Sequence, residues 1–245
     1  MAGRTAWKTM KNLSFRLWVI LWPITIVLSL YPINNRPIRI SLILSFIGLW
    51  AGCLSFSWRR QIARSVLLFC TLIVAGFLIC PGRNYAIERL RTAYVARLRS
   101  FEGTRYIWGG ENKRGIDCSG LVRAGLIKAT FQQGLLTMNP RLTRFALSLW
   151  WHDASAEALG QEYRQQTKYL FATSSINELD QNKVMPGDIA VTASGVHVLA
   201  CLGGGEWIEA DPHFGKVVII KLPAEKNPWF QEPVKILRWR ELDVE

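Results

Sequence analysis

The sequence predicts an α+β domain, with helices packed on an antiparallel sheet, that follows three transmembrane helices. Three observations support this prediction. The first 80 of the 245 residues contain three long apolar runs. The middle of the chain repeats apolar residues at spacings of three and four, the period of a helix packed on one face. After residue 185 the chain breaks into short apolar runs separated by glycine, which is typical of antiparallel strands.

The three apolar runs cover about residues 13–31, 40–58 and 62–80. Each is close to the roughly 20 residues that cross a bilayer as a helix. The first run ends at Tyr31-Pro32 without a small-x-small cleavage site, so we interpret it as an anchor and not as a signal peptide. The alternative is a buried helical hairpin of a soluble protein, but a chain of this size has little interior for three such runs.

The charge distribution follows the same division. The chain has 30 Lys and Arg against 18 Asp and Glu, a formal net charge of +12. Residues 1–80 hold nine of the basic and none of the acidic residues, which leaves 21 basic and 18 acidic residues, a net of +3, for the rest. The excess positive charge lies between apolar runs and does not cover the surface of a soluble domain. We therefore expect no nucleic-acid partner.

The basic residues also predict an orientation. With the N-terminus in the cytoplasm, seven lie on the cytoplasmic side and five on the other. The seven are Arg4, Lys8, Lys11, Arg16, Arg59, Arg60 and Arg64, and the five are Arg36, Arg39, Arg83, Arg89 and Arg91. Three spans then place the remainder of the chain outside the cytoplasm. We expect a membrane anchor over residues 1–82, in contact with the lipid bilayer, and a second domain over residues 83–245.

The second domain begins with helical patterns. Apolar residues recur at helical spacing from Ile87 to Phe101, and an apolar helix follows Asp117-Cys118-Ser119-Gly120. Asn139-Pro140 predicts an N-cap and a first-turn proline of the next helix. A further helical stretch is expected roughly over residues 156–171.

The strands come later. Five short runs after Pro186-Gly187-Asp188 have strand character, and Gly203-Gly204-Gly205 predicts a hairpin turn between the second and the third. The runs are 189–192, 196–202, 206–210, 217–221 and 234–238.

Cys118 is the candidate nucleophile. It lies where a glycine-rich segment enters a helix, and the backbone N–H groups of a helix start favour a thiolate and could hold an oxyanion. Asp117 and Ser119 beside it are poor core residues, which argues against inert packing. Of the other cysteines, Cys53, Cys70 and Cys80 lie in the apolar runs, and the five together do not form a disulfide pattern.

A cysteine nucleophile needs a base, and the chain offers three histidines, His152, His197 and His213. We favour His197, because it begins a strand and side chains on strands are positioned best. Glu209, on the strand beyond the triple-glycine turn, could accept the imidazole N–H and orient the ring. By spacing alone an exposed strand position for Glu209 is equally compatible.

These residues carry a resemblance to a known family. Tyr106-Ile107-Trp108-Gly109-Gly110, Asp117-Cys118-Ser119-Gly120, Met185-Pro186-Gly187-Asp188 and His197 on a strand occur in the order found in NlpC-type cell-wall cysteine peptidases. The resemblance covers roughly residues 85–238. It implies a papain-like fold and a bacterial enzyme that cuts peptidoglycan stem peptides.

The resemblance also implies roles for single residues. Cys118 matches the nucleophile and His197 the base. Glu209 takes the place of a third polar residue that is usually His, Asn or Gln, which is a departure from the pattern. Tyr106 matches a tyrosine near the oxyanion position, and Trp108, Asp117 and Ser119 belong to the expected substrate-binding set.

The implied reaction is hydrolysis of an amide, typically between γ-D-glutamate and a diamino acid, through a thioester on Cys118. It needs no metal ion or organic cofactor. The implied location is a bacterial inner membrane, crossed several times, with the catalytic domain facing the periplasm or the cell exterior. Two alternatives remain: a papain-like hydrolase or acyltransferase acting on a lipid-linked or other amide or ester, and an inactive cell-wall-binding domain.

A second departure is the spacing of 79 residues between Cys118 and His197, which is longer than the compact family pattern. The extra length fits a helical insertion at about residues 134–155. This insertion could narrow the site as a lid, contact the bilayer surface through Trp150-Trp151, or form a satellite hydrophobic cluster.

Overall fold

The computed structural model describes residues 2–243 and divides the chain into two compact units, Met1–Cys80 and Pro81–Glu245. The first unit consists of helices α1 (Ala2–Leu30), α2 (Arg36–Ser57) and α3 (Gln61–Ile79). All three contain a stretch long and apolar enough to cross a membrane, and no residue of α3 is buried. The three apolar runs of the sequence are therefore helices, as predicted.

Within the first unit, α1 and α2 are joined by side-chain contacts. The indole N–H of Trp18 donates to the carbonyl oxygen of Leu49 at 3.0 Å, and the Trp18 ring meets the Phe56 ring edge-on. The indole of Trp50 in α2 donates to the hydroxyl of Thr71 in α3.

The second unit has the predicted α+β architecture. Four helices come first in this unit, and a six-stranded sheet follows them. A short hairpin with strands of two residues each lies between the first and the second helix. The helices are α4 (Ile87–Arg99), α5 (Cys118–Leu136), α6 (Pro140–Trp151) and α7 (Ala156–Gly160), and the hairpin pairs β1 (Glu111–Asn112) with β2 (Gly115–Ile116).

The six-stranded sheet is antiparallel throughout, in the order β3-β8-β4-β5-β6-β7. Its strands are β3 (Thr167–Thr173), β4 (Ile189–Thr192), β5 (Val198–Gly203), β6 (Glu206–Asp211), β7 (Lys216–Lys221) and β8 (Val234–Trp239). Gly203, the last residue of β5, and Gly204 and Gly205 after it all have positive φ, which allows the tight turn. The sheet thereby places the start of β5 beside the end of β6 at its centre.

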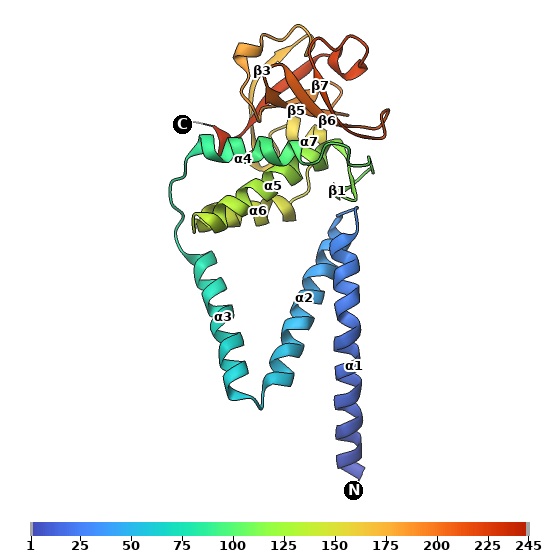
Figure 1. The fold of residues 1–245 in the computed structure, drawn as a ribbon, viewed down its shortest axis with the longest axis vertical. Helices are drawn as coiled ribbons and strands as arrows, with labels where there is room; N and C mark the ends of the chain where they lie inside the picture. The colour runs from blue at the N-terminus through green and yellow to red at the C-terminus, as the bar shows by residue number, and fades with distance from the viewer. Residues whose placement is uncertain (1, 244–245) are drawn as a thin grey trace. The chain divides into compact units, whose positions relative to one another are not determined.

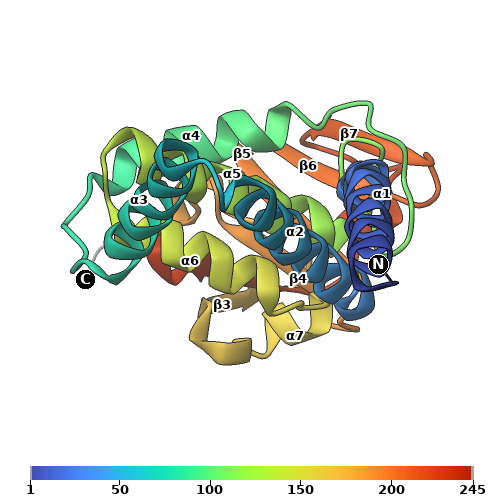
Figure 2. The same ribbon diagram turned by 90° about the horizontal axis from the view of Figure 1, so that it is seen from below.

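Alternation along the strands gives the sheet two buried faces. Val198, Ala200 and Ile208 point into the main core with helices α4 to α7. Leu199 and Trp207 point to the other face, which the loop segments around Ile176 and Phe230 cover. Figures 1 and 2 show the helices gathered on one side of the sheet.

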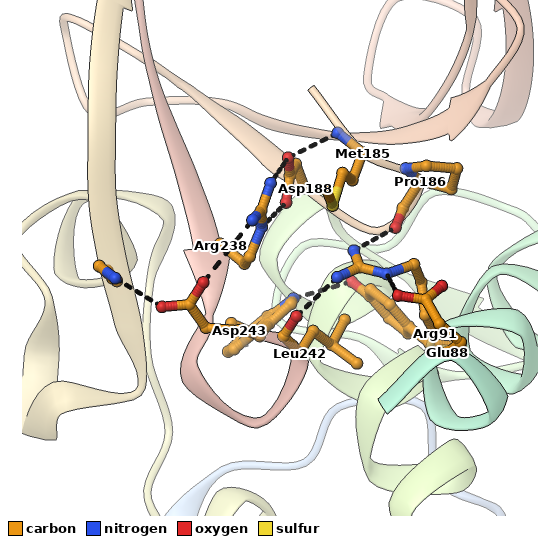
Figure 3. A network of polar contacts seen from close by, with 11 residues as sticks. Glu88, Arg91, Met185, Pro186, Asp188, Arg238, Leu242 and Asp243 are labelled. Carbon is orange, nitrogen blue, oxygen red and sulfur yellow. Dashed lines mark hydrogen bonds and ion pairs between the residues drawn. The ribbon is translucent and has the colours of Figure 1, made fainter. Parts of the chain in front are cut away.

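Buried polar contacts fix α4 to the sheet and to α5. The hydroxyl of Tyr94, a fully buried residue, donates to the carbonyl oxygen of Val122 at 3.1 Å and accepts from the indole of Trp239 at 3.0 Å. Arg91 donates to the carbonyl oxygens of Pro186 and Leu242 (Figure 3).

The Met185-Pro186-Gly187-Asp188 segment has a structural role that Figure 3 also shows. The buried carboxylate of Asp188 accepts two hydrogen bonds from the guanidinium of Arg238, at 2.7 and 2.8 Å, and one from the backbone N–H of Met185. Hydrogen bonding to Asp188 raises the pKa of Arg238. This bidentate pair joins the turn before β4 to β8.

One element differs from the prediction. The helix expected over residues 156–171 ends at Gly160, and Thr167–Thr173 forms β3 at the sheet edge. Between them Glu162, Arg164 and Gln165 take positive φ values of 53° to 56°, which break the helix. The β-branched and aromatic residues of the segment then pair with β8, so tertiary pairing outweighs the local helical pattern.

Candidate functional site

Cys118 is the first residue of α5, and Asp117 is its N-cap. The Asp117 carboxylate accepts from the backbone N–H of Gly120 at 2.6 Å, from that of Gly109 at 2.7 Å and from the hydroxyl of Ser119 at 3.0 Å. The side chain of Asp117 thus ties the glycine-rich loop to the first turn of α5. Cys118 lies in this turn, where the backbone N–H groups of a helix have no hydrogen-bond partner within the helix itself.

Two glycines allow this loop to approach the helix. A Cβ atom on Gly120 would lie 2.0 Å from the carbonyl oxygen of Gly110, and one on Gly110 would lie 2.5 Å from that of Gly115. The backbone N–H of Asp117 also donates to the carbonyl oxygen of Gly110. Side chains at either glycine would displace the backbone that holds Cys118.

His197 directly precedes β5, and its side chain is buried. Its backbone N–H donates to the hydroxyl of Thr192 at 3.1 Å. Its ring stacks on the indole of Trp229, with centroids 4.3 Å apart and planes inclined by 19°. The ring is therefore fixed by both a backbone contact and an aromatic face.

Glu209 lies on β6, the neighbour of β5, and is fully buried. Its Oε2 lies 2.7 Å from Nε2 of His197, and its Oε1 accepts from the amide of Asn227 at 2.6 Å. Both carboxylate oxygens are thus hydrogen-bonded, which a buried carboxylate requires. The exposed position that spacing alone allowed for Glu209 is excluded.

Cys118 and His197 interact across the gap between α5 and β5. Burial lowers the pKa of His197, but hydrogen bonds with Cys118 and Glu209 and the charges of these two groups raise it to about 9. Because Glu209 holds Nε2, the other ring nitrogen, Nδ1, is the one left for the thiol. The Sγ atom of Cys118 also lies 4.0 Å from the carbonyl oxygen of Val196. The arrangement can hold a thiolate beside a protonated imidazole.

Of the expected substrate-binding residues, Tyr106, Asp117 and Ser119 lie close to Cys118, and they differ in exposure. Tyr106 is half-buried, and burial together with the charges of Cys118, Asp117 and Asp211 raises its pKa to about 12. Trp108 is 82% exposed. Ser119 is half-buried, and its hydroxyl is bonded to Asp117.

Sequence reasoning missed two residues of this site, Asn227 and Trp229. Both belong to the segment around the short 3-10 helix η3 (Pro228–Phe230), which Asn227 caps through the backbone N–H of Trp229. The signal that could have found them is Asn227-Pro228, a cap pattern in a loop without a role of its own. Their distance in sequence from His197 and Glu209 hides the contact.

The other histidines lie elsewhere. Nδ1 of His152 lies 2.9 Å from the carbonyl oxygen of Ser148 at the end of α6, and His213 meets Phe214 in the turn after β6. Of the three histidines, the structure places His197 beside the cysteine.

The chain also resembles known proteins. The model of the NlpC/P60 family matches residues 103–238. No curated protein matches the chain.

Solved structures also resemble the chain. NlpC1 from Trichomonas vaginalis is 18% identical, with a TM-score of 0.41, over 64% of this chain and 46% of that one. The chain thus spans about half the length of that protein. A P60 domain of an M. avium subspecies paratuberculosis antigen is 20% identical, with a TM-score of 0.37, over 64% of this chain and 98% of that one. The peptidoglycan hydrolase RipB from Mycobacterium tuberculosis is 18% identical, with a TM-score of 0.37, over 66% and 76% of the two chains.

Proposed function

Because the chain belongs to the NlpC/P60 family, we propose that it is a cysteine peptidase that hydrolyses an amide bond in peptidoglycan stem peptides. One observation carries the proposal. The thiol of Cys118, at the start of α5, interacts with a buried histidine whose other nitrogen lies 2.7 Å from a buried carboxylate. This is the nucleophile, base and orienting group that acyl transfer needs.

The first step is attack of the Cys118 thiolate on the amide carbonyl carbon. The thiol proton moves to His197, and the Glu209 carboxylate stabilises the resulting imidazolium. A C–S bond forms and the carbonyl oxygen becomes an oxyanion. We assign two donors to this oxyanion: the backbone N–H of Cys118, at the positive end of the α5 dipole, and the hydroxyl of Tyr106.

The second step releases the amine and then the acid. The imidazolium of His197 protonates the leaving nitrogen as the C–N bond breaks, which leaves a thioester on Cys118. His197 then takes a proton from water, which attacks the thioester and returns the free thiol. The bond assigned to this reaction is the one between γ-D-glutamate and a diamino acid.

Substrate binding is assigned to four residues, of which Tyr106, Asp117 and Ser119 lie close to the thiol. The exposed ring of Trp108 offers an apolar face to the stem peptide, and Tyr106 lines the site near the oxyanion. Asp117 and Ser119 meet the polar backbone or free amine of the substrate. Because the Asp117 carboxylate already accepts three hydrogen bonds, its contribution is the negative charge that it places there.

Residues 1–82 are proposed to be a membrane anchor, and residues 83–245 the peptidase domain, with a helical insertion over about 134–155. The three long apolar helices support the anchor. The family resemblance implies a bacterial inner membrane, and the distribution of basic residues, seven against five, favours a catalytic domain that faces the periplasm or the cell exterior.

The decisive experiment is mass spectrometry of peptidoglycan fragments incubated with the full chain and with Cys118→Ala. The wild type should produce fragments with a new amine at the diamino acid, and the variant should produce none. Equal cleavage by both would exclude Cys118 as the nucleophile.

A thiol-reactive probe distinguishes the peptidase from an inactive binding domain. Burial raises the pKa of the Cys201 thiol to about 11, so this residue provides an internal reference for an unactivated thiol. Site-resolved labelling should modify Cys118 faster than Cys201, and His197→Ala should remove the difference. Equal labelling in the wild type would favour the binding domain.

A further inference from the structure

A pocket of about 190 Å³ lies far along the domain from Cys118, between the start of α4 and the turn that joins α5 to α6. Two arginines belong to its wall and no acidic residue does. It is lined by Arg83, Asn84, Tyr85, Ala86, Arg89, Leu90, Gln133, Thr137, Asn139 and Leu142. The pocket therefore combines an apolar floor with positive charge, a composition that suits an amphipathic anion.

Asn139 holds the segment before α4 in this pocket. Its amide donates to the carbonyl oxygen of Arg83 at 2.7 Å and its Oδ1 accepts from the backbone N–H of Arg83 at 3.2 Å. Asn139 is 1% exposed. A Cβ atom on Gly82 would lie 2.4 Å from Cβ of Arg141, so the chain before Arg83 is also packed closely against α6. The backbone position of Arg83 is thus fixed.

The two arginines of the pocket are available for a ligand. Both are exposed, and in the part of the chain that the structure describes neither guanidinium has a hydrogen bond or ion pair. Other arginines on or near α4 are engaged. Arg91 binds two backbone carbonyls, Arg97 binds Gln132, Arg99 pairs with Glu206, and Arg141 lies over the Tyr85 ring.

An apolar tip adjoins the pocket. We use this name for Leu135, Leu136 and Met138, whose exposed fractions are 47%, 64% and 63%. Met138 has φ of 48°, and the N–H groups of Met138 and Asn139 donate to the carbonyl oxygens of Leu135 and Gly134. This is the helix ending in which glycine usually takes the left-handed position. Here a methionine takes it and presents an apolar side chain to solvent.

We propose that the pocket binds the phosphate of an anionic lipid headgroup while the apolar tip enters the interfacial layer of the same bilayer. This inference rests on the proposed membrane anchor and not on the peptidase activity. Cys80, Pro81 and Gly82 alone separate the end of α3 from Arg83, and four peptide units reach at most about 14 Å. A bilayer that holds α3 therefore has its surface within reach of the pocket.

The chemistry of the surface supports a lipid and not a soluble anion. Basic side chains around exposed apolar residues are typical of surfaces that lie in the membrane interface. A free phosphate would satisfy the arginines but would leave the three apolar side chains of the tip in water.

The test uses the full chain in nanodiscs, with the photo-crosslinking residue p-benzoylphenylalanine in place of Leu136. The control carries the same residue in place of Phe214, which is 52% exposed. Phe214 lies in the turn after β6, and the backbone N–H of Tyr106 donates to the carbonyl oxygen of Gly215 in this turn. In discs with phosphatidylglycerol, irradiation should give lipid adducts at position 136 and few at position 214. Equal yields would overturn the proposal.

Matched variants test the headgroup and the tip separately. Arg83→Gln and Arg89→Gln should each lower the adduct yield at position 136 by up to about fivefold in anionic discs, and the two Lys variants should keep most of it. The wild-type chain in discs of neutral lipid should give about the same adduct yield at position 136 as the double Gln variant in anionic discs. Met138→Gly should also lower the yield without loss of folding, because glycine is favoured at this φ. If the adduct yield changes neither with the charge of the lipid nor with replacement of the two arginines, the headgroup assignment is overturned.

The outcomes also separate this inference from the proposed function. If α1 to α3 do not span a membrane, the chain will not co-purify with the discs at all. Cleavage of soluble muropeptides by the Arg83→Gln, Arg89→Gln double variant should equal that of the wild type, since neither arginine lies at the catalytic site. Addition of inorganic phosphate should not compete with the lipid adduct. Complete competition would overturn the proposal in favour of a soluble anion.

Discussion

Glu209 and the ring of His197 meet in a part of the protein that is almost closed to solvent. The pKa of His197 rises from an ordinary value of 6.5 to about 9, so its protonated form is favoured in the folded state. The stabilisation that this provides is fully present below pH 6.5 and is lost as the pH rises towards 9. Both folding stability and proton donation to the leaving amine should therefore decline on the alkaline side.

Glu209→Gln tests this pair. The amide cannot balance an imidazolium, so the pKa of His197 should fall and the alkaline limb of kcat/KM should move to lower pH. The rate at the optimum should fall on the order of 10²-fold. A pH profile of muropeptide cleavage measures both effects. An alkaline limb at the wild-type position would show that another group sets it.

Asn227 is expected to position Glu209 through its 2.6 Å hydrogen bond. Asn227→Ala should lower kcat about tenfold with little change in KM, because a hydrogen bond to a buried carboxylate is lost. It should also shift the pH profile, since an unsupported carboxylate can rotate away from the ring.

Asn177→Ala is the matched control for Asn227→Ala. Asn177 holds the same loop by accepting from the backbone N–H of Ala224 at 2.8 Å, and within residues 2–243 it forms no hydrogen bond with Glu209. It should leave the pH profile unchanged. If both variants shift the profile alike, Asn227 acts through the loop and not through the carboxylate.

The family resemblance predicted that Cys118, His197 and Glu209 converge, whereas spacing alone left an exposed position for Glu209 equally compatible, and the catalytic roles of the three remain predictions. A helix start, a strand alternation and a glycine turn each fix geometry locally, and the three together bring the side chains to one place. Asn227 and Trp229 were not predictable in this way. They reach His197 and Glu209 through an irregular loop, whose path depends on packing against the far face of the sheet.

Among the elements, α7 and β3 show where local pattern fails. The apolar spacing of residues 156–171 is compatible with a helix, but the segment from Thr167 pairs with β8 from end to end. Strand pairing of this kind is a contact between distant parts of the chain, so a local period cannot reveal it. The five later strands were predictable because glycine turns delimit them.

The joint between α5 and α6 depends on one buried arginine. Arg123 of α5 is 2% exposed and contacts Glu111 at 2.8 Å, Asp153 at 2.5 Å and the carbonyl oxygen of Leu149 at 2.9 Å. Arg123→Ala leaves the buried carboxylate of Glu111 without this partner and should lower the free energy of unfolding by about 3–5 kcal/mol. Urea unfolding of the detergent-solubilised chain measures the change.

Arg99→Ala provides the control for Arg123→Ala. Arg99 forms an ion pair of similar length, 2.6 Å, with Glu206, but both side chains are largely accessible to solvent. Its removal should lower the free energy of unfolding much less than Arg123→Ala does, because solvent screens an exposed ion pair. Equal losses in the two variants would mean that burial does not govern these ion pairs.

At the scale of the whole molecule, the two units have different proposed roles, membrane anchoring for the first and catalysis for the second. All residues assigned to catalysis lie in Pro81–Glu245, which has its own continuous core. Residues 81–245 expressed alone should fold and cleave soluble muropeptides at a rate within a few-fold of the full chain, and should be lost from the membrane fraction. Circular dichroism and a cleavage assay measure this. An unfolded fragment would show that the second unit depends on the first.

The hydrogen bonds between Asn139 and Arg83 bear on the reach of the proposed peptidase. Only Cys80, Pro81 and Gly82 lie between α3 and Arg83, so this connection spans at most about 14 Å. The thiol stands at one end of α5, about 28 Å along the helix from the end beside Asn139. If the proposed anchor and the proposed peptidase activity are both correct, the thiol works within roughly a few nanometres of the lipid surface, and the expected substrates are the stem peptides that lie in this layer.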